Sequence, residues 1–571
     1  MERPPGLALG GVLTAAFAIA LVAIAATGSD DTRFGDARQL DALRPAPVGA
    51  KVRASSLGAG PAVPPEVLAS RGEWPLPNRD YANTRATMDS SIRASNVNRL
   101  GVAWTLHLRG ASKWGSAASG PVILGGVAYV QDLLSNVRAI DMSNGTVRWA
   151  HEFAQKAFGP NGVSVGWGKV YASDGDREMV ALGLRTGRVV WRSRLAGPTG
   201  QQQPLPYDGT VLTGIAAGRV KRGSGRVLKT GLLEPGASGF AYALDERTGR
   251  VAWEFQTVRS GFWGTPAVNS GAGIWYPPAV DVKTGVTFWS TGNPAPAPGT
   301  DRYPNASSRP GPNLYSNSVL AIARATGRLR WFNQALPHDL FHHDLQNPPI
   351  LAEANGRSLV IASGKMGVVY AIDRDSGRLV WKRPVGRHEN DNRRALPADE
   401  AVTVYPGFWG GIETPGALAG DTVYYQVDDL PTPYTATAWH AKDGETSVQN
   451  LEGRTQYDQG TSLLVALDTA TGAVRWSTRL PTVGFGGATV VNDLVLTATY
   501  DGTIYALRRS DGQIVWHFQA PGGINAWPAV SRDTIVWPVG LGRKPVILAL
   551  RLGGAPAPPA PEARAAKVVG G

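Results

Sequence analysis

The sequence predicts an all-β fold, an eight-bladed β-propeller, preceded by an N-terminal transmembrane helix. Seven times, a turn residue and glycine are followed four residues later by tryptophan, at intervals of roughly one propeller blade. An eighth tryptophan, Trp104, continues the same spacing toward the N-terminus. The seven copies are Gly145…Trp149, Gly187…Trp191, Gly249…Trp253, Gly327…Trp331, Gly377…Trp381, Gly472…Trp476 and Gly512…Trp516.

Each copy predicts two strands joined by a tight turn. The glycine supplies the positive φ that such a turn needs. An apolar residue lies two after each glycine, and residues two apart on a strand share a face. We therefore expect this residue and the tryptophan to point into the same buried layer. The apolar residues are Val147, Val189, Val251, Leu329, Leu379, Val474 and Ile514.

A sandwich of many short strands is the structural alternative, since it also needs frequent turns. The 70 glycines and 18 tryptophans allow one or two chance copies of the pattern, but not seven with matching apolar partners. The 571 residues also suit one closed propeller. The propeller is therefore the preferred interpretation.

The N-terminal stretch from Gly6 to Thr27 is uncharged and rich in Ala, Leu, Val and Ile. As a helix it is long enough to cross the hydrocarbon core of a bilayer. Arg3 precedes it, and Asp30 and Asp31 follow it, which predicts a cytoplasmic N-terminus and an exported body. A cleaved signal peptide is the rival, although its apolar region is usually shorter.

Four regions follow from these patterns. Residues 1–31 are the cytoplasmic tip and signal-anchor, 32–72 a flexible linker, 73–552 the propeller, and 553–571 a disordered Pro/Ala-rich tail. Two longer inserts interrupt the blade rhythm, between Trp253 and Trp331 and between Trp381 and Trp476. Inserted loops of a propeller commonly build a site over one end of its channel.

Charge and cysteine usage exclude several functions. The net charge is +12, but the basic residues are scattered singly, so nucleic acid is not an expected partner. The chain has no cysteine. Disulfides, thiolate metal sites, iron–sulfur clusters and a covalently attached haem are therefore excluded.

Several segments resemble the pyrroloquinoline-quinone (PQQ)-dependent alcohol dehydrogenases, the eight-bladed quinoproteins. The resemblance covers about Trp74 to Leu550, nearly the whole predicted propeller. The segments are Trp74-Pro-Leu-Pro-Asn-Arg-Asp-Tyr-Ala-Asn-Thr-Arg85, Ser95-Asn-Val-Asn-Arg-Leu-Gly-Val-Ala-Trp104, Trp289-Ser-Thr-Gly-Asn-Pro-Ala-Pro296 and Trp331-Phe-Asn-Gln-Ala-Leu-Pro-His-Asp-Leu-Phe-His-His-Asp344.

The resemblance implies residues that bind PQQ and Ca²⁺. Glu234 and Asn293 match the family's calcium ligands, and their oxygens suit that hard cation. Trp275 matches the tryptophan on which the planar quinone stacks, and Lys365 the cation that polarises the quinone carbonyls. The alternatives are a turn glutamate, a turn-capping asparagine, a core tryptophan and a solvated lysine.

The sequence departs from the family's pattern at the catalytic position and at two other places. Ala323 stands where we expect the family's catalytic aspartate, and alanine accepts no proton. The family's adjacent-cysteine disulfide is absent, with Phe158-Gly-Pro-Asn161 in its place. Late in the sequence, the segment that contains Glu413 stands where the family has an Asn-Trp contact. Glu413 is a candidate to substitute for the missing catalytic carboxylate.

A histidine cluster follows Pro337. His338 and His342, four apart, would share a helix face, and His343 and Asp344 follow, which raises a metal site as an interpretation. The resemblance instead implies that this segment is a structural loop.

The resemblance implies a dehydrogenase that oxidises an alcohol or polyol with PQQ and Ca²⁺, and the N-terminal apolar stretch predicts that it is membrane-anchored and extracytoplasmic. Electrons would pass to an external cytochrome or a membrane quinone. The alternative is a non-catalytic propeller that serves as a scaffold or binding module at the cell surface. Propeller hydrolases and lectins remain as further possibilities.

Overall fold

The computed structural model describes residues 62–70, 72–109, 112, 114–157, 159–199, 202–219, 236–258, 261–443 and 447–555. Within these ranges no helix is long and apolar enough to cross a membrane. The predicted transmembrane segment 6–27 lies outside them, as does Glu234.

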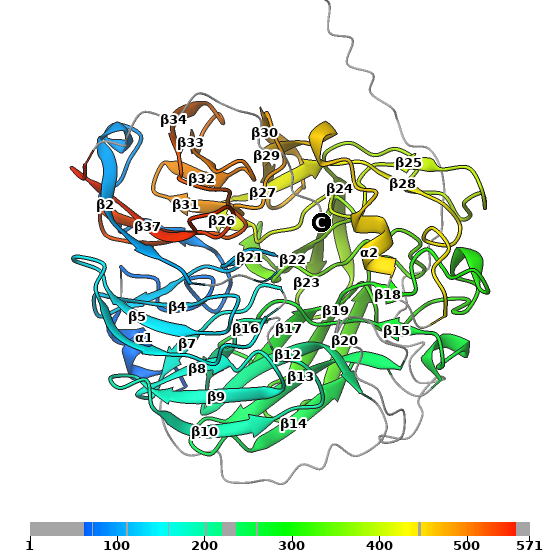
Figure 1. Ribbon diagram of the computed structural model, residues 1–571, viewed down its shortest axis with the longest axis horizontal. Coiled ribbons are helices and arrows are strands. Elements are labelled where there is room, and N and C mark those ends of the chain that lie inside the picture. The colour runs from blue at the N-terminus through cyan, green and yellow to red at the C-terminus, as the bar shows by residue number, and fades with distance from the viewer. Residues whose placement is uncertain are drawn as a thin grey trace, which may run out of the picture. The chain divides into compact units, whose positions relative to one another are not determined.

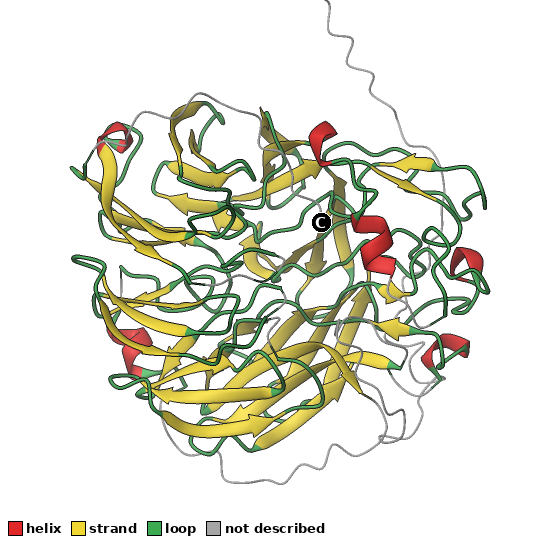
Figure 2. Cartoon of the chain, in the orientation of Figure 1, coloured by secondary structure: helices red, strands yellow, loops and turns green. Residues whose placement is uncertain are grey.

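The described chain forms eight sheets, each built on four antiparallel strands, which confirms the predicted eight blades (Figures 1 and 2). We number them 1 to 8 in chain order. Blades 1 to 4 are β3 (Val122–Leu124), β4 (Val127–Gln131), β5 (Val137–Asp141) and β6 (Val147–His151); β7 (Ser164–Gly166), β8 (Lys169–Ser173), β9 (Glu178–Gly183) and β10 (Val189–Arg194); β11 (Leu205–Tyr207), β12 (Thr210–Arg219), β13 (Ala237–Asp245) and β14 (Val251–Gln256); and β16 (Ala279–Asp281), β17 (Val286–Ser290), β19 (Ser318–Ala323) and β20 (Leu329–Gln334).

Blades 5 to 7 have the same order, and blade 8 combines both ends of the propeller. They are β21 (Ile350–Ala354), β22 (Arg357–Ser363), β23 (Val368–Asp373) and β24 (Leu379–Pro384); β26 (Ala417–Ala419), β27 (Thr422–Asp429), β29 (Thr461–Asp468) and β30 (Val474–Leu480); β31 (Thr489–Val491), β32 (Leu494–Ala498), β33 (Thr503–Arg508) and β34 (Ile514–Gln519); and β35 (Ala529–Ser531), β36 (Thr534–Val539), β37 (Val546–Leu552) and β2 (Leu100–His107).

Short elements complete the described fold. β1 (Ala86–Thr87) pairs with β31, and β15 (Ser270–Gly271) and β18 (Pro294–Ala295) extend blade 3. β25 (Val402–Val404) pairs with β28 (Thr432–Tyr434) in a separate two-stranded sheet. The helices are α1 (Pro65–Ala69), α2 (Ser447–Glu452), η2 (Val97–Arg99), η3 (Phe262–Gly264), η4 (Pro304–Ala306) and η5 (Tyr457–Gln459).

The ring closes through the antiparallel pairing of β2 with β37, which lie side by side in blue and red in Figure 1. Leu100 pairs with Leu552 and His107 with Val546. This pairing covers the edge that an open sheet would leave exposed.

In seven of the eight described blades the repeated tryptophan joins the blade to the next. The indole N–H of Trp331 donates to the carbonyl oxygen of Arg374 at 3.0 Å, and its ring lies on Gly377 of the next turn. A Cβ on Gly377 would come within 2.7 Å of this ring, so glycine is needed for close approach as well as for its φ of 73°. The same donation joins Trp104 to Met142, Trp149 to Leu184, Trp191 to Glu246, Trp253 to Arg324, Trp381 to Thr469 and Trp476 to Arg509.

The expected burial of these tryptophans is confirmed in part. Trp104, Trp191, Trp253 and Trp331 are buried, while the other four are half-buried. One of these, Trp516, belongs to blade 7 and faces blade 8. In blade 8 the two outer strands, β37 and β2, come from opposite ends of the propeller, so no hairpin turn joins them.

The prediction that each apolar partner shares the tryptophan's face is wrong. In blade 1, Trp149 pairs with Ala139 and Val147 with Ile140, so Arg148 is an extra residue in a β-bulge. Because Ala139 and Ile140 point to opposite faces, so do their partners, and Val147 is 40% exposed. The register shift recurs in all eight described blades.

Residues 73–92, which we call the channel segment, connect the first strands of several blades. First strands of neighbouring blades contact each other, as β16 and β21, β21 and β26, and β26 and β31 do, so they lie nearest the propeller axis. Trp74 bridges to Ile123 of blade 1. Carbonyl oxygens farther along accept backbone N–H groups from blades 4 to 7: Tyr81 from Val280, Ala82 from Leu351, Thr84 from Leu418, Arg85 from Val490 and Thr87 from Asn492.

The end of the predicted linker is docked on the propeller. The Glu66 carboxylate of α1 accepts the backbone N–H groups of Trp167 and Gly168 in the β7–β8 turn. The Ala62 carbonyl oxygen accepts the N–H of Asp208. Residues from 62 onward therefore pack against blades 2 and 3.

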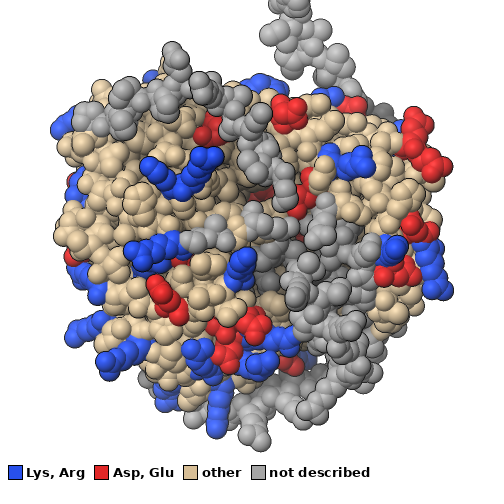
Figure 3. Space-filling model, viewed as in Figure 1, with Lys and Arg blue, Asp and Glu red and all other residues tan. Residues whose placement is uncertain are grey.

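The two inserts pack on each other. Ala306 from the first insert shares one hydrophobic cluster with Val404, Phe408, Tyr434 and Leu451 from the second. On the face shown in Figure 3, basic and acidic side chains lie interspersed.

We predict that Gly377→Ala lowers the melting temperature more than Gly356→Ala in the same blade. Both glycines have φ of 73°, where alanine costs roughly 1–2 kcal/mol. Only at Gly377 does the new methyl group also collide with a tryptophan, which adds about 1–3 kcal/mol. Thermal unfolding followed by circular dichroism measures both, and equal losses would contradict the packing role.

Candidate functional site

One cavity of about 160 Å³ combines residues from blades and inserts. Trp527 lines it and also lies against the buried Arg85, whose guanidinium carbon is 5.8 Å from the indole centroid. The cavity and the channel segment therefore meet at this indole. The lining residues include Trp114, Gly159, Pro160, Trp275, Tyr276, His342, Asp344, Gln346, Lys365, Phe408, Trp409, Glu413, Thr414, Tyr457, Phe485, Tyr500, Asn525 and Trp527.

Lys365 is presented by the tight loop between β22 and β23. Its backbone N–H donates to the Asp344 carbonyl oxygen at 2.8 Å, which ties the two segments together. A side chain on Gly364 would collide with that carbonyl, so this close approach requires glycine. Farther along the loop, the Gly367 carbonyl oxygen accepts the N–H of Val385 and contacts His388 Nε2 at 3.2 Å.

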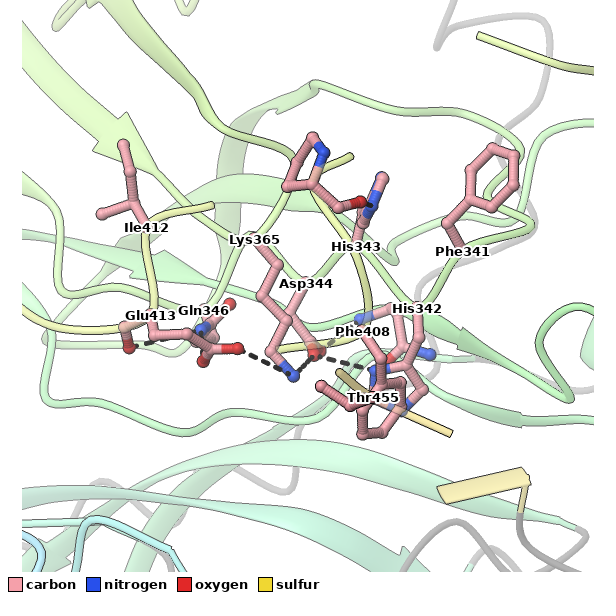
Figure 4. A network of polar contacts seen from close by, with 12 residues as sticks. Phe341, His342, His343, Asp344, Gln346, Lys365, Phe408, Ile412, Glu413 and Thr455 are labelled. Atoms are coloured by element: carbon pink, nitrogen blue, oxygen red, sulfur yellow. Dashed lines mark hydrogen bonds and ion pairs between the residues drawn. The ribbon is translucent and has the colours of Figure 1, made fainter. Parts of the chain in front are cut away.

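The ammonium of Lys365 lies between two carboxylates (Figure 4). Its Nζ is 3.0 Å from Asp344 Oδ2 and 3.6 Å from Glu413 Oε1. On the far side of Asp344, His342 Nδ1 is 3.3 Å from the same Oδ2. Gln346 donates to Glu413 Oε2 at 3.1 Å. All five side chains are buried.

The two carboxylates have opposite pKa shifts. Burial alone would raise the pKa of Asp344, but the charge of Lys365 and the donors His342 and Asn293 hold it below its usual value. Burial raises the pKa of Glu413 to about 8, despite the lowering effect of Lys365. Burial opposes the charged form of Lys365, yet the two carboxylates raise its pKa overall. A Lys365–Asp344 ion pair therefore lies beside a carboxyl group that takes up or releases a proton near pH 8.

Aromatic rings surround this charged group. Lys365 Nζ lies 4.4 Å from the ring centroid of Trp409 and 5.3 Å from that of Phe408, distances typical of cation–π contacts. Trp275, Tyr276 and Trp527 line other parts of the cavity, and the Tyr276 and Trp527 rings are 5.7 Å apart.

Several polar atoms of the lining residues are buried without a hydrogen-bond partner among the described residues. They include His342 Nε2, Trp409 Nε1, Trp527 Nε1, Thr414 Oγ1, Gln346 Oε1 and Glu413 Oε1. Unpaired buried donors and acceptors are costly, and a polar ligand in the cavity would satisfy them. The cavity thus combines flat aromatic surfaces, a cation and unsatisfied polar groups.

The structure brings some of the predicted residues together. Trp275, Lys365 and Glu413 line the same cavity. Asn293 lies directly behind it: its backbone N–H donates to Asp344 Oδ1 at 2.8 Å, while its side-chain amide donates to the Pro294 carbonyl oxygen. The fourth predicted cofactor residue, Glu234, lies outside the described residues.

Ala323 lies away from the cavity. It ends β19, and its N–H donates to the Arg328 carbonyl oxygen within the blade turn. Asp141 and Asp373 occupy the matching place in blades 1 and 5, where they accept hydrogen bonds from their own turns. Alanine at this position therefore removes a turn acceptor and leaves the cavity lining unchanged.

The three neighbouring histidines have separate partners. His338 Nδ1 contacts the Gly311 carbonyl oxygen, His343 Nε2 contacts that of Pro406, and His342 adjoins Asp344. Among the described residues no group of three or more His, Cys, Asp or Glu side chains is placed to hold a metal ion.

Sequence reasoning missed part of the site. Asp344 was assigned to a structural loop, although it ends one of the recognisable motifs and supplies the carboxylate nearest Lys365. Trp114, Trp409 and Trp527 carried no distinguishing signal, since tryptophan is also the repeated blade residue.

Comparisons with known proteins agree with this architecture. Residues 74–402 match the model of the glucose/ethanol/alcohol dehydrogenase β-propeller domain, and residues 452–549 match that of the outer membrane protein assembly factor BamB. The quinohemoprotein alcohol dehydrogenase ADH IIB of Pseudomonas putida is 27% identical over 519 residues, covering 80% of this chain and 71% of its own. The putative dehydrogenase XoxF of Paracoccus denitrificans is 26% identical over 538 residues, covering 79% and 84%.

Solved structures share the fold. The quinohemoprotein alcohol dehydrogenase from Comamonas testosteroni superposes with a TM-score of 0.71 at 21% identity, covering 86% of this chain and 82% of its own. A europium-containing methanol dehydrogenase gives 0.66 at 19% identity, covering 84% and 92%.

Proposed function

Because this chain belongs to the glucose/ethanol/alcohol dehydrogenase family of PQQ β-propellers, we propose that it binds PQQ and oxidises an alcohol. The observation that carries the proposal is the buried ammonium of Lys365, set between Asp344 and Glu413 in an aromatic cavity. A buried cation beside flat ring surfaces suits a planar quinone with anionic substituents.

The residues present fit PQQ. Trp275 offers a ring face for stacking, and Lys365 offers a positive charge to the quinone oxygens. The unpartnered groups of His342, Trp409, Trp527 and Thr414 would meet its polar substituents.

The charges around the cavity also favour an anion. Burial lowers the pKa of Arg85 only to about 9, so it stays largely protonated at neutral pH. Glu413, with a pKa of about 8, is then mostly neutral. The described lining then carries one cation, Lys365, and one anion, Asp344, and Arg85 behind Trp527 adds a second positive charge.

Calcium fits the described residues less well. Ca²⁺ takes six to eight oxygen ligands. The oxygens of Asp344 already accept or face nitrogen groups of Asn293, Lys365 and His342. The described residues alone do not make up a Ca²⁺ site, so Glu234 and Asn293 as ligands stay a prediction. No step below depends on the metal.

Oxidation of an alcohol removes a proton from its oxygen and a hydride from its carbon. A bound quinone would supply the hydride-accepting chemistry. In this chain Glu413 is the group that accepts the proton from the alcohol oxygen. It faces the cavity, and its Oε1 has no hydrogen-bond partner among the described residues. Asp344 is a weaker base because Lys365 holds it ionised.

The rival proposal, a non-catalytic scaffold, rested on Ala323 and on the missing disulfide. The first argument falls away because Ala323 lies in a blade turn outside the cavity. The dehydrogenase is therefore the better-supported function.

We also propose that the propeller is extracytoplasmic and anchored by residues 6–27, and that a separate cytochrome or membrane quinone takes up the electrons. The uncharged length of 6–27 and the flanking charges support this topology.

Adding PQQ to the purified protein should quench tryptophan fluorescence with saturation. Lys365→Met should weaken this binding about tenfold or more, because a charged hydrogen bond contributes about 1.5–3 kcal/mol. Lys283→Met, at an exposed turn, is the matched control. Circular dichroism confirms folding of each variant, and equal affinity in all three proteins would refute the role of Lys365.

Alcohol oxidation by the PQQ-loaded protein should rise with pH and level off above about pH 8, because only ionised Glu413 accepts a proton. Glu413→Gln should lower kcat about 10²–10⁴-fold and remove this pH dependence. Rates are measured with an artificial electron acceptor. A Gln variant with unchanged kcat would assign the proton to another group, such as His342.

Protease added to intact cells should digest the propeller and leave a short membrane-bound stub. A mature chain that begins near Thr27 would instead identify residues 6–27 as a cleaved signal peptide.

A further inference from the structure

The cavity has a charged part and an aromatic part with different burial. Asp344, Lys365 and Glu413 are at most 8% exposed. The partly exposed lining residues include Trp114, Trp409, Tyr457 and Tyr500, together with Asn525. A molecule that enters from solvent therefore meets aromatic side chains before it reaches the charged group.

These aromatic side chains form one continuous wall. The Trp114 and Trp409 rings are 5.2 Å apart in an edge-to-face arrangement. Phe485 lies 5.5 Å from Tyr500, and Tyr500 stacks on Tyr457 at 6.3 Å. Trp409, Tyr457 and Tyr500 all pack against one hydrophobic cluster that contains Leu430 and Val483.

The aromatic wall offers few polar groups to a ligand. Among the described residues that line it, the wall has no charged side chain, and its polar groups are the Tyr457 and Tyr500 hydroxyls, the indole N–H groups and Asn525. The Asn525 amide already donates to the Trp114 carbonyl oxygen at 3.3 Å. A polyol held here would lose water from several hydroxyls without an equal number of partners, which is unfavourable.

We propose that the substrate is an alcohol with an aromatic or extended apolar body, and that Tyr457 and Tyr500 select it against polyols. This inference rests on the proposed function. The hydroxyl group reaches Glu413 at the charged end, where the carboxylate takes its proton; a bound quinone would supply the acceptor for the hydride. The body of the substrate lies against Tyr457, Tyr500 and Trp409.

The wall combines two distant parts of the sequence. Tyr457 is in η5 within the second insert, and Tyr500 lies between β32 and β33 of blade 7. The two tyrosines can thus be changed without touching Lys365, Asp344 or Glu413.

The test compares benzyl alcohol with glycerol on the full-length, PQQ-loaded protein in detergent. We expect kcat/KM to be at least about 100-fold higher for benzyl alcohol. The double variant Tyr457→Ala/Tyr500→Ala should reduce this ratio about tenfold or more. Tyr457→Phe/Tyr500→Phe keeps the rings and should retain most of it. A preference for glycerol, or an equal ratio in the Ala and Phe variants, would overturn the inference.

A binding measurement separates this inference from the proposed function. Benzyl methyl ether has the same ring but no oxidisable hydroxyl, and its affinity is measured by calorimetry in the same three proteins. Binding that weakens about tenfold in the Ala variant alone supports the aromatic site even if no alcohol is oxidised. Absence of binding, or an affinity that is the same in all three proteins, would overturn it.

Discussion

The pairing of β2 with β37 is the constraint on which the rest of the molecule depends. It joins residues 100–107 to residues 546–552 and turns eight sheets into a ring. The cavity needs that ring, because Trp114 precedes blade 1 and Asn525 follows blade 7, yet the Asn525 amide donates to the Trp114 carbonyl oxygen. Seven of the eight contacts between neighbouring blades then follow one rule, an indole resting on the next blade's turn glycine, and the contact of blade 7 with blade 8 is the exception.

The repeating part of the fold could be predicted from the sequence because its cause is local. A glycine that must adopt positive φ and a tryptophan four residues later recur whatever else the blade contains. The bulge between them could not be predicted from a period of two, since an extra residue such as Arg148 leaves no compositional trace. The channel segment was also hidden, because its backbone carbonyl groups make much of its connection to blades 4 to 7, and backbone groups leave no trace in side-chain types.

The candidate site was predictable where a motif fixed the backbone. Lys365 lies between two glycines, and Gly364 is needed for the contact with Asp344, so this residue could be located. Ala323 was misjudged because a strand-end aspartate is common to many blade turns. The aromatic wall could not be predicted, because Trp409, Tyr457 and Tyr500 meet only after two segments far apart in sequence pack together.

Blade 8 is completed by strands from both ends of the propeller, and this has a consequence for biosynthesis. β37 is the last strand of the propeller to be synthesised, while its partner β2 is among the first. Until synthesis reaches residue 552, β2 lacks its pairing partner and the growing chain has unpaired strand edges at both ends of an incomplete ring. Such edges are templates for association with other chains. The growing chain therefore exposes the unpaired edge of β2 through nearly its whole period of synthesis.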